Sequence, residues 1–528
     1  MTHDAEEPTV WKDDQDVLAH LGYKQEMKRN FSRWELFGLS FSIVGVVQSI
    51  AAVLLYSIPY GGPVGMIWGW FTCCILLIFV GMAMAELGSS APTAGGLYYW
   101  TFKFSSPRYR RLLSWLIGYI NTAAYCAGVA SVDWGCATQI MAVVTIGSNG
   151  SFVPTNAQTY GLYCALLLSH AIMASLATKI IAKLQWLYVS LNIGLFLAVI
   201  IALPVSAPEQ LVNKASYAFG HFENVFWRLR GQSVAGFDTS VHISEEAKNA
   251  TRAVPFAIMC ATVLSSILGW VVNIVVAFNM GNDLESVIEN PIGQPMATIF
   301  ANTVGRTGTV VIWAFIVVTL YFTAMDYLMA GSRQIFAFSR DNGLPFSRIL
   351  YNINPRTRTP IHAVFFCAFI SALLGLISFA GPVAITAVFT TSVVGQYIGF
   401  VTPIIARFIG GTRFVHGPFN LGFLSAPVAF IASTYMIFMI IVFLFPAAPL
   451  PASESMNYTV VVVGGTILLS LGYYFFPRYG GMYWFTGPVH IITIDRVKGT
   501  GKPELEAGDG NGDNQSEGRG EKGDPTSI

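Results

Sequence analysis

The chain has 528 residues, of which 54% are hydrophobic and only 11% are charged. Soluble domains carry about 25% charged residues, so this composition excludes an ordinary soluble protein and is typical of an integral membrane protein. The net charge of +1 leaves no basic surface for nucleic acid, and we expect the lipid bilayer to be the main environment of the chain.

The two ends of the chain differ from the rest. Residues 1–33 are polar and lack the apolar core of a cleavable signal peptide, so they predict a cytoplasmic N-terminal segment. Residues 495–528 are rich in Gly, Asp, Glu and Lys and predict a disordered cytoplasmic tail. Between them, residues 34–494 contain eleven apolar runs of about the length that spans a bilayer. They are 35–57, 63–87, 112–145, 159–179, 185–205, 254–280, 308–332, 361–380, 383–406, 427–446 and 458–477.

Charge sets the orientation of these runs. Lys and Arg gather in the N-terminal segment and in alternate loops, which places both ends of the chain in the cytoplasm. The alternation requires a further crossing between residues 224 and 245. There the sequence FWRLRGQSVAGFDTSVHISE is short and charged for an ordinary span. The chain therefore predicts an all-α membrane protein of about 12 transmembrane helices, with an irregular sixth crossing.

Several classes of function lack their motifs. The seven cysteines lie in apolar runs without metal-ligand spacing, so we expect neither a disulfide framework nor a metal site. The sequence has no P-loop and no HExxH or GxSxG motif, so it predicts no cofactor, no ATP-driven transport and no enzyme. An ion channel stays a weaker alternative, because no repeated filter loop is present.

Five segments, spread in order over nearly all the spans, resemble a known group of transporters. This group is the amino acid–polyamine–organocation superfamily, and within it the fungal amino acid/choline transporter family. The segments are residues 21–54, AELGSSAPTAGGLYYW (85–100), residues 114–135, AGFDTSVHISEEAKNATRAVP (235–255) and GSRQIFAFSRDNGLPFS (331–347).

The resemblance implies a LeuT-like fold, in which spans 1–5 and 6–10 are inverted repeats and spans 11 and 12 are added. It implies a secondary active transporter for amino acids or related small amines such as GABA, with proton-coupled uptake by alternating access. Choline or polyamine transport is the alternative within the same family. The plasma membrane is the expected location, with the vacuolar membrane as the second choice.

The resemblance also places a helix break in span one and another in span six. Exposed backbone groups at such breaks bind substrates and ions. Gly45 adapts to non-helical torsions, although close helix packing would also explain it. Asp238 would face a substrate ammonium or carry a proton, or else cap the helix that follows it. The substrate-binding candidates are Val44, Gly45, Gln48 and Ser49 in span one and Gly236, Phe237, Asp238 and Thr239 in span six.

Ionisable residues at membrane depth are costly and are candidates for coupling or gating. We name Asp133, Asp326, His242 and Glu245. Structural hydrogen bonds are the alternative for the two aspartates, and His170 is interpreted as a lone, packed histidine. Glu245 and Glu246 are expected to pair with Lys248, Arg252 or arginines of neighbouring loops as an inner latch, or else to form a solvated helix end.

The outer half of span six is short. Only residues 225–235 precede the break, and they include Arg228 and Arg230. At 1.5 Å per residue this stretch covers ~16 Å, about half of the membrane. We expect a shortened outer half-helix and, as a further alternative, a copy with impaired transport.

Overall fold

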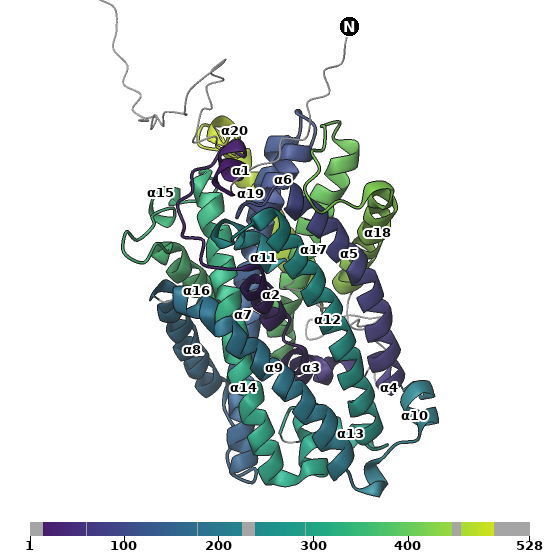
Figure 1. The fold of residues 1–528 in the computed structure, drawn as a ribbon. Coiled ribbons are helices and arrows are strands. Elements are labelled where there is room, and N and C mark those ends of the chain that lie inside the picture. The colour runs from purple at the N-terminus through teal and green to yellow at the C-terminus, as the bar shows by residue number, and fades with distance from the viewer. Residues whose placement is uncertain are drawn as a thin grey trace, which may run out of the picture.

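The computed structural model describes residues 14–59, 61–176, 178–223, 238–290, 292–445 and 456–489. Within these ranges the protein is a bundle of tilted helices without a β-strand (Figure 1). Ten helices are long and apolar enough to cross a membrane, and one apolar helix is shorter. Each of the eleven predicted apolar runs corresponds to one of these helices, so the all-helical membrane fold is confirmed.

The long helices have the following bounds. The first ones are α2 (Arg33–Val44) with α3 (Val46–Ser57), α4 (Gly62–Val64) with α5 (Trp70–Ser90), α7 (Arg110–Gly147), α8 (Asn156–Leu176) and α9 (Thr178–Ser206). The later ones are α12 (Ala250–Asn279), α14 (Pro295–Arg340), α16 (Ile361–Gly375), α17 (Pro382–Ile409), α18 (Ser425–Leu444) and the shorter α19 (Thr459–Tyr474).

Short helices join the long ones. They are α1 (Asp14–His20), α6 (Gly96–Phe104), α10 (Ala215–Gly220), α11 (Thr239–His242), α13 (Leu284–Ile288), α15 (Ser347–Leu350) and α20 (Gly481–Trp484). The expected sixth crossing is described only from Asp238 onwards. The outer half-helix that we expected to be short lies outside the described residues, as does the tail 495–528.

The centre of the bundle is built around α7, which packs against α14, α16 and α17. Close approach there depends on small residues. A Cβ on Gly118 would lie 2.3 Å from the ring of Phe338, and a Cβ on Gly128 would lie 2.4 Å from Tyr327. At these glycines the neighbouring side chains pack directly against the backbone of α7, as is usual between membrane helices.

The N-terminal segment 14–32 begins with α1 at one end of the bundle and runs down to α2 (Figure 1). It contacts α6 through Tyr23 and Tyr99, whose ring centroids lie 5.8 Å apart. Phe31 forms a parallel bridge with Ala247, through hydrogen bonds from Phe31 N to Glu246 O (3.0 Å) and from Lys248 N to Phe31 O (2.8 Å). The Asp14 carboxylate accepts from the backbone N–H groups of Asn249 and Ala250, where α12 begins. A carboxylate at this place also complements the positive end of the helix dipole.

One carboxyl group makes the docking of this segment depend on pH. Burial raises the pKa of Glu26, although the Tyr351 hydroxyl, which donates to its Oε1, opposes the shift. A raised carboxyl pKa stabilises the folded protein at low pH, and this contribution is lost as pH rises through the raised pKa. We expect the melting temperature of the wild type, relative to Glu26→Gln, to fall as the pH rises above the ordinary carboxyl pKa of 4.5. A difference in melting temperature between the wild type and Glu26→Gln that does not change with pH would contradict this expectation. Glu285→Gln, at an exposed position, is the control substitution.

Candidate functional site

The first feature of the site is a break in the first membrane span at Gly45, where the break was expected. Gly45 has φ 46° and ψ 78°, in the left-handed region, and α2 ends and α3 begins on either side of it. The first N–H groups of α3 have no intrahelical acceptors, and the last carbonyls of α2 have no intrahelical donors. Ser49 Oγ donates to the carbonyl of Val44 across the break (2.8 Å), so this hydroxyl is used within the break itself.

Side chains from α9 and α14 hold the break in place. Gln48 Nε2 donates to Asn192 Oδ1 (2.9 Å) and to Thr323 Oγ1 (3.3 Å). Thr323 Oγ1 donates to the carbonyl of Ser42 (2.7 Å). Gln48 is fully buried, and its Oε1 has no hydrogen-bond partner among the described residues. This acceptor is therefore available beside the break.

Gly45→Ala is expected to reduce the amine uptake that the sequence resemblance implies by more than about tenfold. An alanine at φ 46° costs roughly 1–2 kcal/mol, and its Cβ would lie 2.3 Å from Nε2 of Gln48. The substitution therefore displaces the side chain that joins the break to α9 and α14. Gly194→Ala is the matched control, because nothing lies within 4 Å of a Cβ there. The measurement is uptake per molecule in the membrane, and equal rates for the two variants would contradict the expectation.

Asp238 is the centre of the second half of the site. It precedes α11, but its side chain makes no capping hydrogen bond, so its interpretation as a helix cap is wrong. The buried carboxylate accepts a hydrogen bond from Tyr125 OH on α7 (2.8 Å, to Oδ2). Oδ1 has no partner among the described residues. Thr239 follows it and is buried, whereas Gly236 and Phe237 lie outside the described residues.

His242 joins Asp238 to the turn that follows α5. Its Nδ1 lies 2.9 Å from the carbonyl oxygen of Ala94, which can only accept, so Nδ1 carries the hydrogen. In the neutral ring Nε2 is then an acceptor, and it lies 3.5 Å from Asn121 Nδ2 and 3.8 Å from Asp238 Oδ2. The ring of Tyr125 packs edge-on against His242 at 5.0 Å. Asp238, His242 and Tyr125 therefore form one buried polar cluster.

Just beyond this cluster, two ion pairs close one end of the bundle. Glu245 accepts from both guanidinium NH groups of Arg340, each at 2.9 Å, and from Thr93 Oγ1 and Ala94 N. Glu246 pairs with Arg333 at 2.7 Å. Both carboxylates are buried, so a solvated helix end is wrong. The partners are arginines of α14 and not Lys248 or Arg252, because the 244–246 turn faces the last turns of α14.

The other two aspartates occupy separate places. Asp133 Oδ1 lies 2.7 Å from Nδ1 of His170 between α7 and α8, with both side chains fully buried. The interpretation of His170 as a lone histidine is therefore wrong. Asp326 accepts from Gln185 Nε2 through both oxygens, at 3.0 and 3.1 Å. It lies one turn after Thr323 on α14, so it is on the same face of α14 that contacts the break in span one.

Several residues of the site were missed from the sequence. Asn192 and Thr323 support Gln48, and Ala94 binds both His242 and Glu245. The signal for Asn192 was a polar residue alone in an apolar run, which is costly in a membrane without a partner. Ala94 takes part only through its backbone carbonyl and N–H groups, so its identity as alanine could not have indicated this role.

The helix arrangement and the broken first span invite comparison with known proteins. The family model described as amino acid permease matches residues 31–486. The chain belongs to this family. The resemblance to the amino acid–polyamine–organocation superfamily is thereby confirmed.

Relatives of the permease occur in fungi and plants. It is 34% identical to an uncharacterised amino-acid permease of Schizosaccharomyces pombe, over 93% of this chain and 90% of the relative. It is 34% identical to the GABA-specific permease of Saccharomyces cerevisiae, over 87% and 84%. It is 32% identical to an amino-acid permease of Arabidopsis thaliana, over 90% and 96%.

A solved structure shares the fold of the permease. The manganese transporter of Eremococcus coleocola superposes with a TM-score of 0.51 at 12% identity, over 86% of this chain and 93% of that chain. At this identity the likeness concerns the fold alone. It agrees with the expected LeuT-like architecture.

Proposed function

We propose that this permease is a secondary active transporter for amino acids or related small amines such as GABA, with proton-coupled uptake by alternating access. The observation that carries the proposal is buried Asp238, whose Oδ1 has no hydrogen-bond partner in the described part of the chain. It lies beside a broken helix and in one polar cluster with His242. A buried carboxylate oxygen without a partner suits an ammonium donor or a proton. The relative named as a GABA-specific permease supports the substrate class.

The two halves of the site suit the two ends of an amino acid. The first N–H groups of α3, beside Gly45, are donors for a substrate carboxylate. Asp238 Oδ1 and Gln48 Oε1 are acceptors for its ammonium. Choline has no N–H group and only one O–H donor, so it would leave at least one of these acceptors unpaired, and we rank it below amino acids. Polyamines could use the acceptors but would leave the amide donors unused.

We assign coupling to Asp238 with His242, and closure of the inner end to Glu245 with Arg340. Asp326 and Asp133 remain candidates for a further proton-binding step, because both are buried carboxylates. Asp133 lies against His170, and Asp326 accepts from the uncharged amide of Gln185. We also propose that the transporter unit spans residues 34–494 and that both termini lie in the cytoplasm. The plasma membrane is the proposed location, with the vacuolar membrane as the second choice.

The test is an uptake panel in cells that lack their own amine permeases. Radiolabelled GABA and amino acids are offered with and without a protonophore, and unlabelled choline and polyamines serve as competitors. Saturable uptake that collapses without the proton gradient supports the proposal. Non-saturable flux would favour a channel, and no accumulation of any amine would indicate the impaired copy or a different function.

A further inference from the structure

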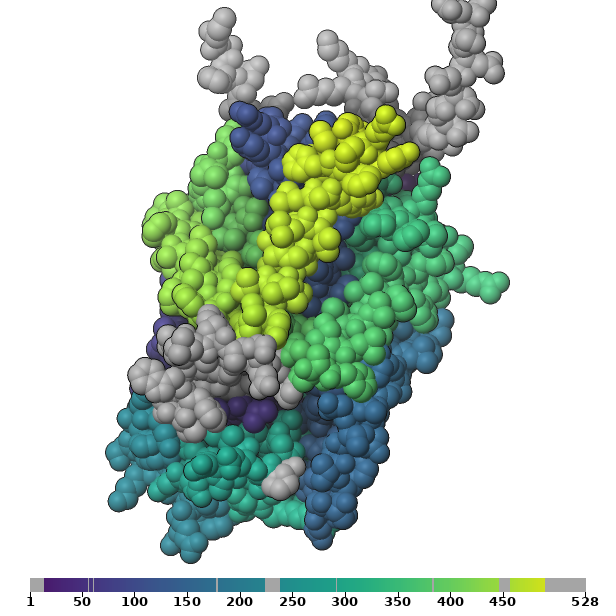
Figure 2. All heavy atoms as spheres, turned by 180° about the vertical axis from the view of Figure 1, so that it is seen from behind, coloured from purple at the N-terminus to yellow at the C-terminus, as the bar shows by residue number. Residues whose placement is uncertain are grey.

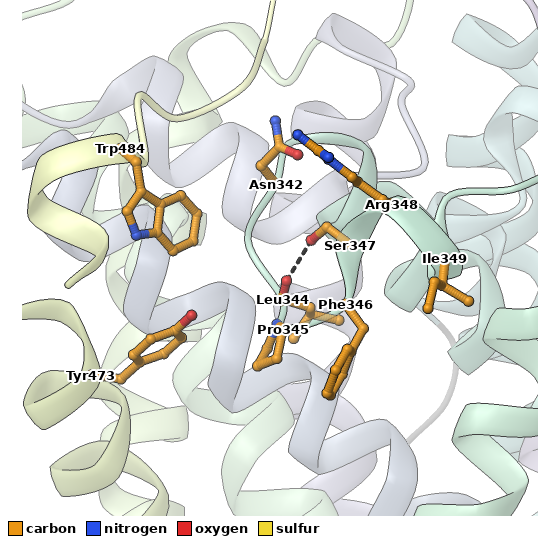
Figure 3. Close-up of a pocket in the computed structure, with 9 residues that line it drawn as sticks. All are labelled: Asn342, Leu344, Pro345, Phe346, Ser347, Arg348, Ile349, Tyr473 and Trp484. Carbon is orange, nitrogen blue, oxygen red and sulfur yellow. Dashed lines mark hydrogen bonds between the residues drawn. The ribbon is translucent and has the colours of Figure 1, made fainter. Parts of the chain in front are cut away.

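A hollow of about 660 Å³ opens at the same end of the bundle as the ion pairs, between the turn after α14 and the end of α19 (Figure 3). This volume is in the range of roughly 300–1,000 Å³ that small-ligand sites occupy. Tyr473 and Trp484 lie on one side, and Pro345, Phe346 and Arg348 lie on the other. The hollow is separate from Asp238 and plays no part in the proposed transport mechanism.

The surroundings of the hollow are those of a membrane interface. The apolar helix α19 ends at Tyr474, on the outer surface of the bundle (Figure 2). Exposed aromatic side chains follow it directly, and α20 adds two more. They are Phe475, Phe476, Tyr479, Tyr483 and Trp484. Aromatic residues gather where membrane spans meet water, at the level of lipid headgroups. The hollow therefore opens at headgroup depth.

The charge of the hollow is positive. None of its nine lining residues is acidic, and Arg348 is exposed. Among the described residues, no carboxylate forms an ion pair with this guanidinium. Arg is suited to phosphate because its planar group donates two parallel hydrogen bonds.

The backbone beside Arg348 is strained. Phe346 has φ 61°, a conformation that a bulky residue rarely adopts, and its side chain is 74% exposed. The strain holds an aromatic ring outward at the edge of a basic hollow. A ring at this place would meet acyl chains while Arg348 meets the headgroup, as amphipathic interface sites do.

We infer that this hollow binds the headgroup of an anionic phospholipid of the inner leaflet. Arg348 pairs with the lipid phosphate, and Trp484, Tyr473 and Phe346 contact the glycerol and the first acyl carbons. The inner leaflet carries the anionic lipids. This end of the bundle holds Arg340, Arg348 and Arg356, and the distribution of basic residues places it in the cytoplasm. The acidic tail after residue 489 is the competing occupant.

The test is native mass spectrometry of the purified full-length permease with phosphatidylglycerol or phosphatidylcholine of the same chain length. We expect the wild type to prefer phosphatidylglycerol about tenfold, because both lipids offer a phosphate but the choline ammonium of phosphatidylcholine offsets that charge and is repelled by Arg348. Arg348→Gln should weaken the binding of both lipids and lose the preference. Arg356→Gln is the matched control, since Arg356 is exposed but does not line the hollow. Trp484→Ala should weaken both lipids together.

Five outcomes would overturn the inference. They are equal binding of the two lipids by the wild type, an unchanged preference in Arg348→Gln, and the same loss in Arg356→Gln. The fourth is displacement of the lipid by millimolar inorganic phosphate, which would make the hollow a site for free anions. A variant that ends at residue 489 serves as a further arm. If the preference for phosphatidylglycerol appears only in this variant, the tail is the occupant and the lipid is not.

Discussion

Asp238→Asn is expected to reduce gradient-driven uptake by about 10- to 100-fold while leaving the amount of permease in the membrane unchanged. The asparagine has nearly the same shape and still accepts the hydrogen bond from Tyr125 OH. It carries no charge for a substrate ammonium and cannot exchange a proton at neutral pH. A charged hydrogen bond contributes roughly 1.5–3 kcal/mol, which gives this range.

The pH profile separates a mechanistic role for Asp238 from a structural one. Uptake is measured across pH in the wild type, in Asp238→Asn and in Tyr125→Phe, with exposed Asp16→Asn as the control. The asparagine variant should lose the response to the proton gradient, whereas Tyr125→Phe should lose a few-fold in rate and keep the response. Uptake by Asp238→Asn at the wild-type rate and with the wild-type pH profile would remove this residue from the mechanism.

Arg340→Gln is expected to have the largest effect on stability. The Arg340 side chain is fully buried, it forms two hydrogen bonds to Glu245, and its guanidinium lies 3.8 Å from the ring centroid of Tyr23. Its removal leaves the buried Glu245 carboxylate without its cation, which costs about 3–5 kcal/mol. We expect a lower melting temperature and an inner end that opens more often, measured by thermal unfolding and by accessibility of that end to labelling reagents.

A double variant tests the origin of this loss. In Arg340→Gln with Glu245→Gln both members of this ion pair are neutral, so stability should recover in large part. Uptake should not recover, because the contact that closes the inner end is still absent. Arg413→Gln is the control for loss of an exposed arginine. A double variant as unstable as Arg340→Gln would show that the arginine acts through packing against Tyr23 and not through the ion pair.

The sequence was sufficient for the spans and for the position of the first break. Apolar runs of bilayer length have few alternatives to helices, and Gly45 stands within an apolar run where a break needs its torsional freedom. The side-chain pairings were harder to predict. Asp133 with His170, and Glu245 with Arg340, are 37 and 95 residues apart in the chain. The rotation and tilt of the helices determine which of these distant side chains meet, and neither can be derived from the composition of the chain.

The distinction between a cap and a site at Asp238 also required coordinates. An aspartate before a short helix is a frequent cap, and only the direction of its side chain toward Tyr125 separates the two interpretations. In the same way, the sequence predicted that Glu245 and Glu246 pair with Lys248, Arg252 or arginines of neighbouring loops, without choosing among these cations. Lys248 and Arg252 are near in sequence, whereas Arg340 and Arg333 are near in space.

The peptide groups of Ala94 have a consequence for the stoichiometry of transport. The carbonyl of this residue accepts from His242, and its N–H donates to Glu245. In the proposed mechanism, a proton arriving at Asp238 and the ion pair that closes the inner end would therefore share a single residue, in a turn where Gly96 has φ 42°. If this turn were flexible, the Glu245–Arg340 ion pair could open whether or not Asp238 was protonated. Such a permease would leak, carrying protons without amine or amine without protons, even with every charged residue intact.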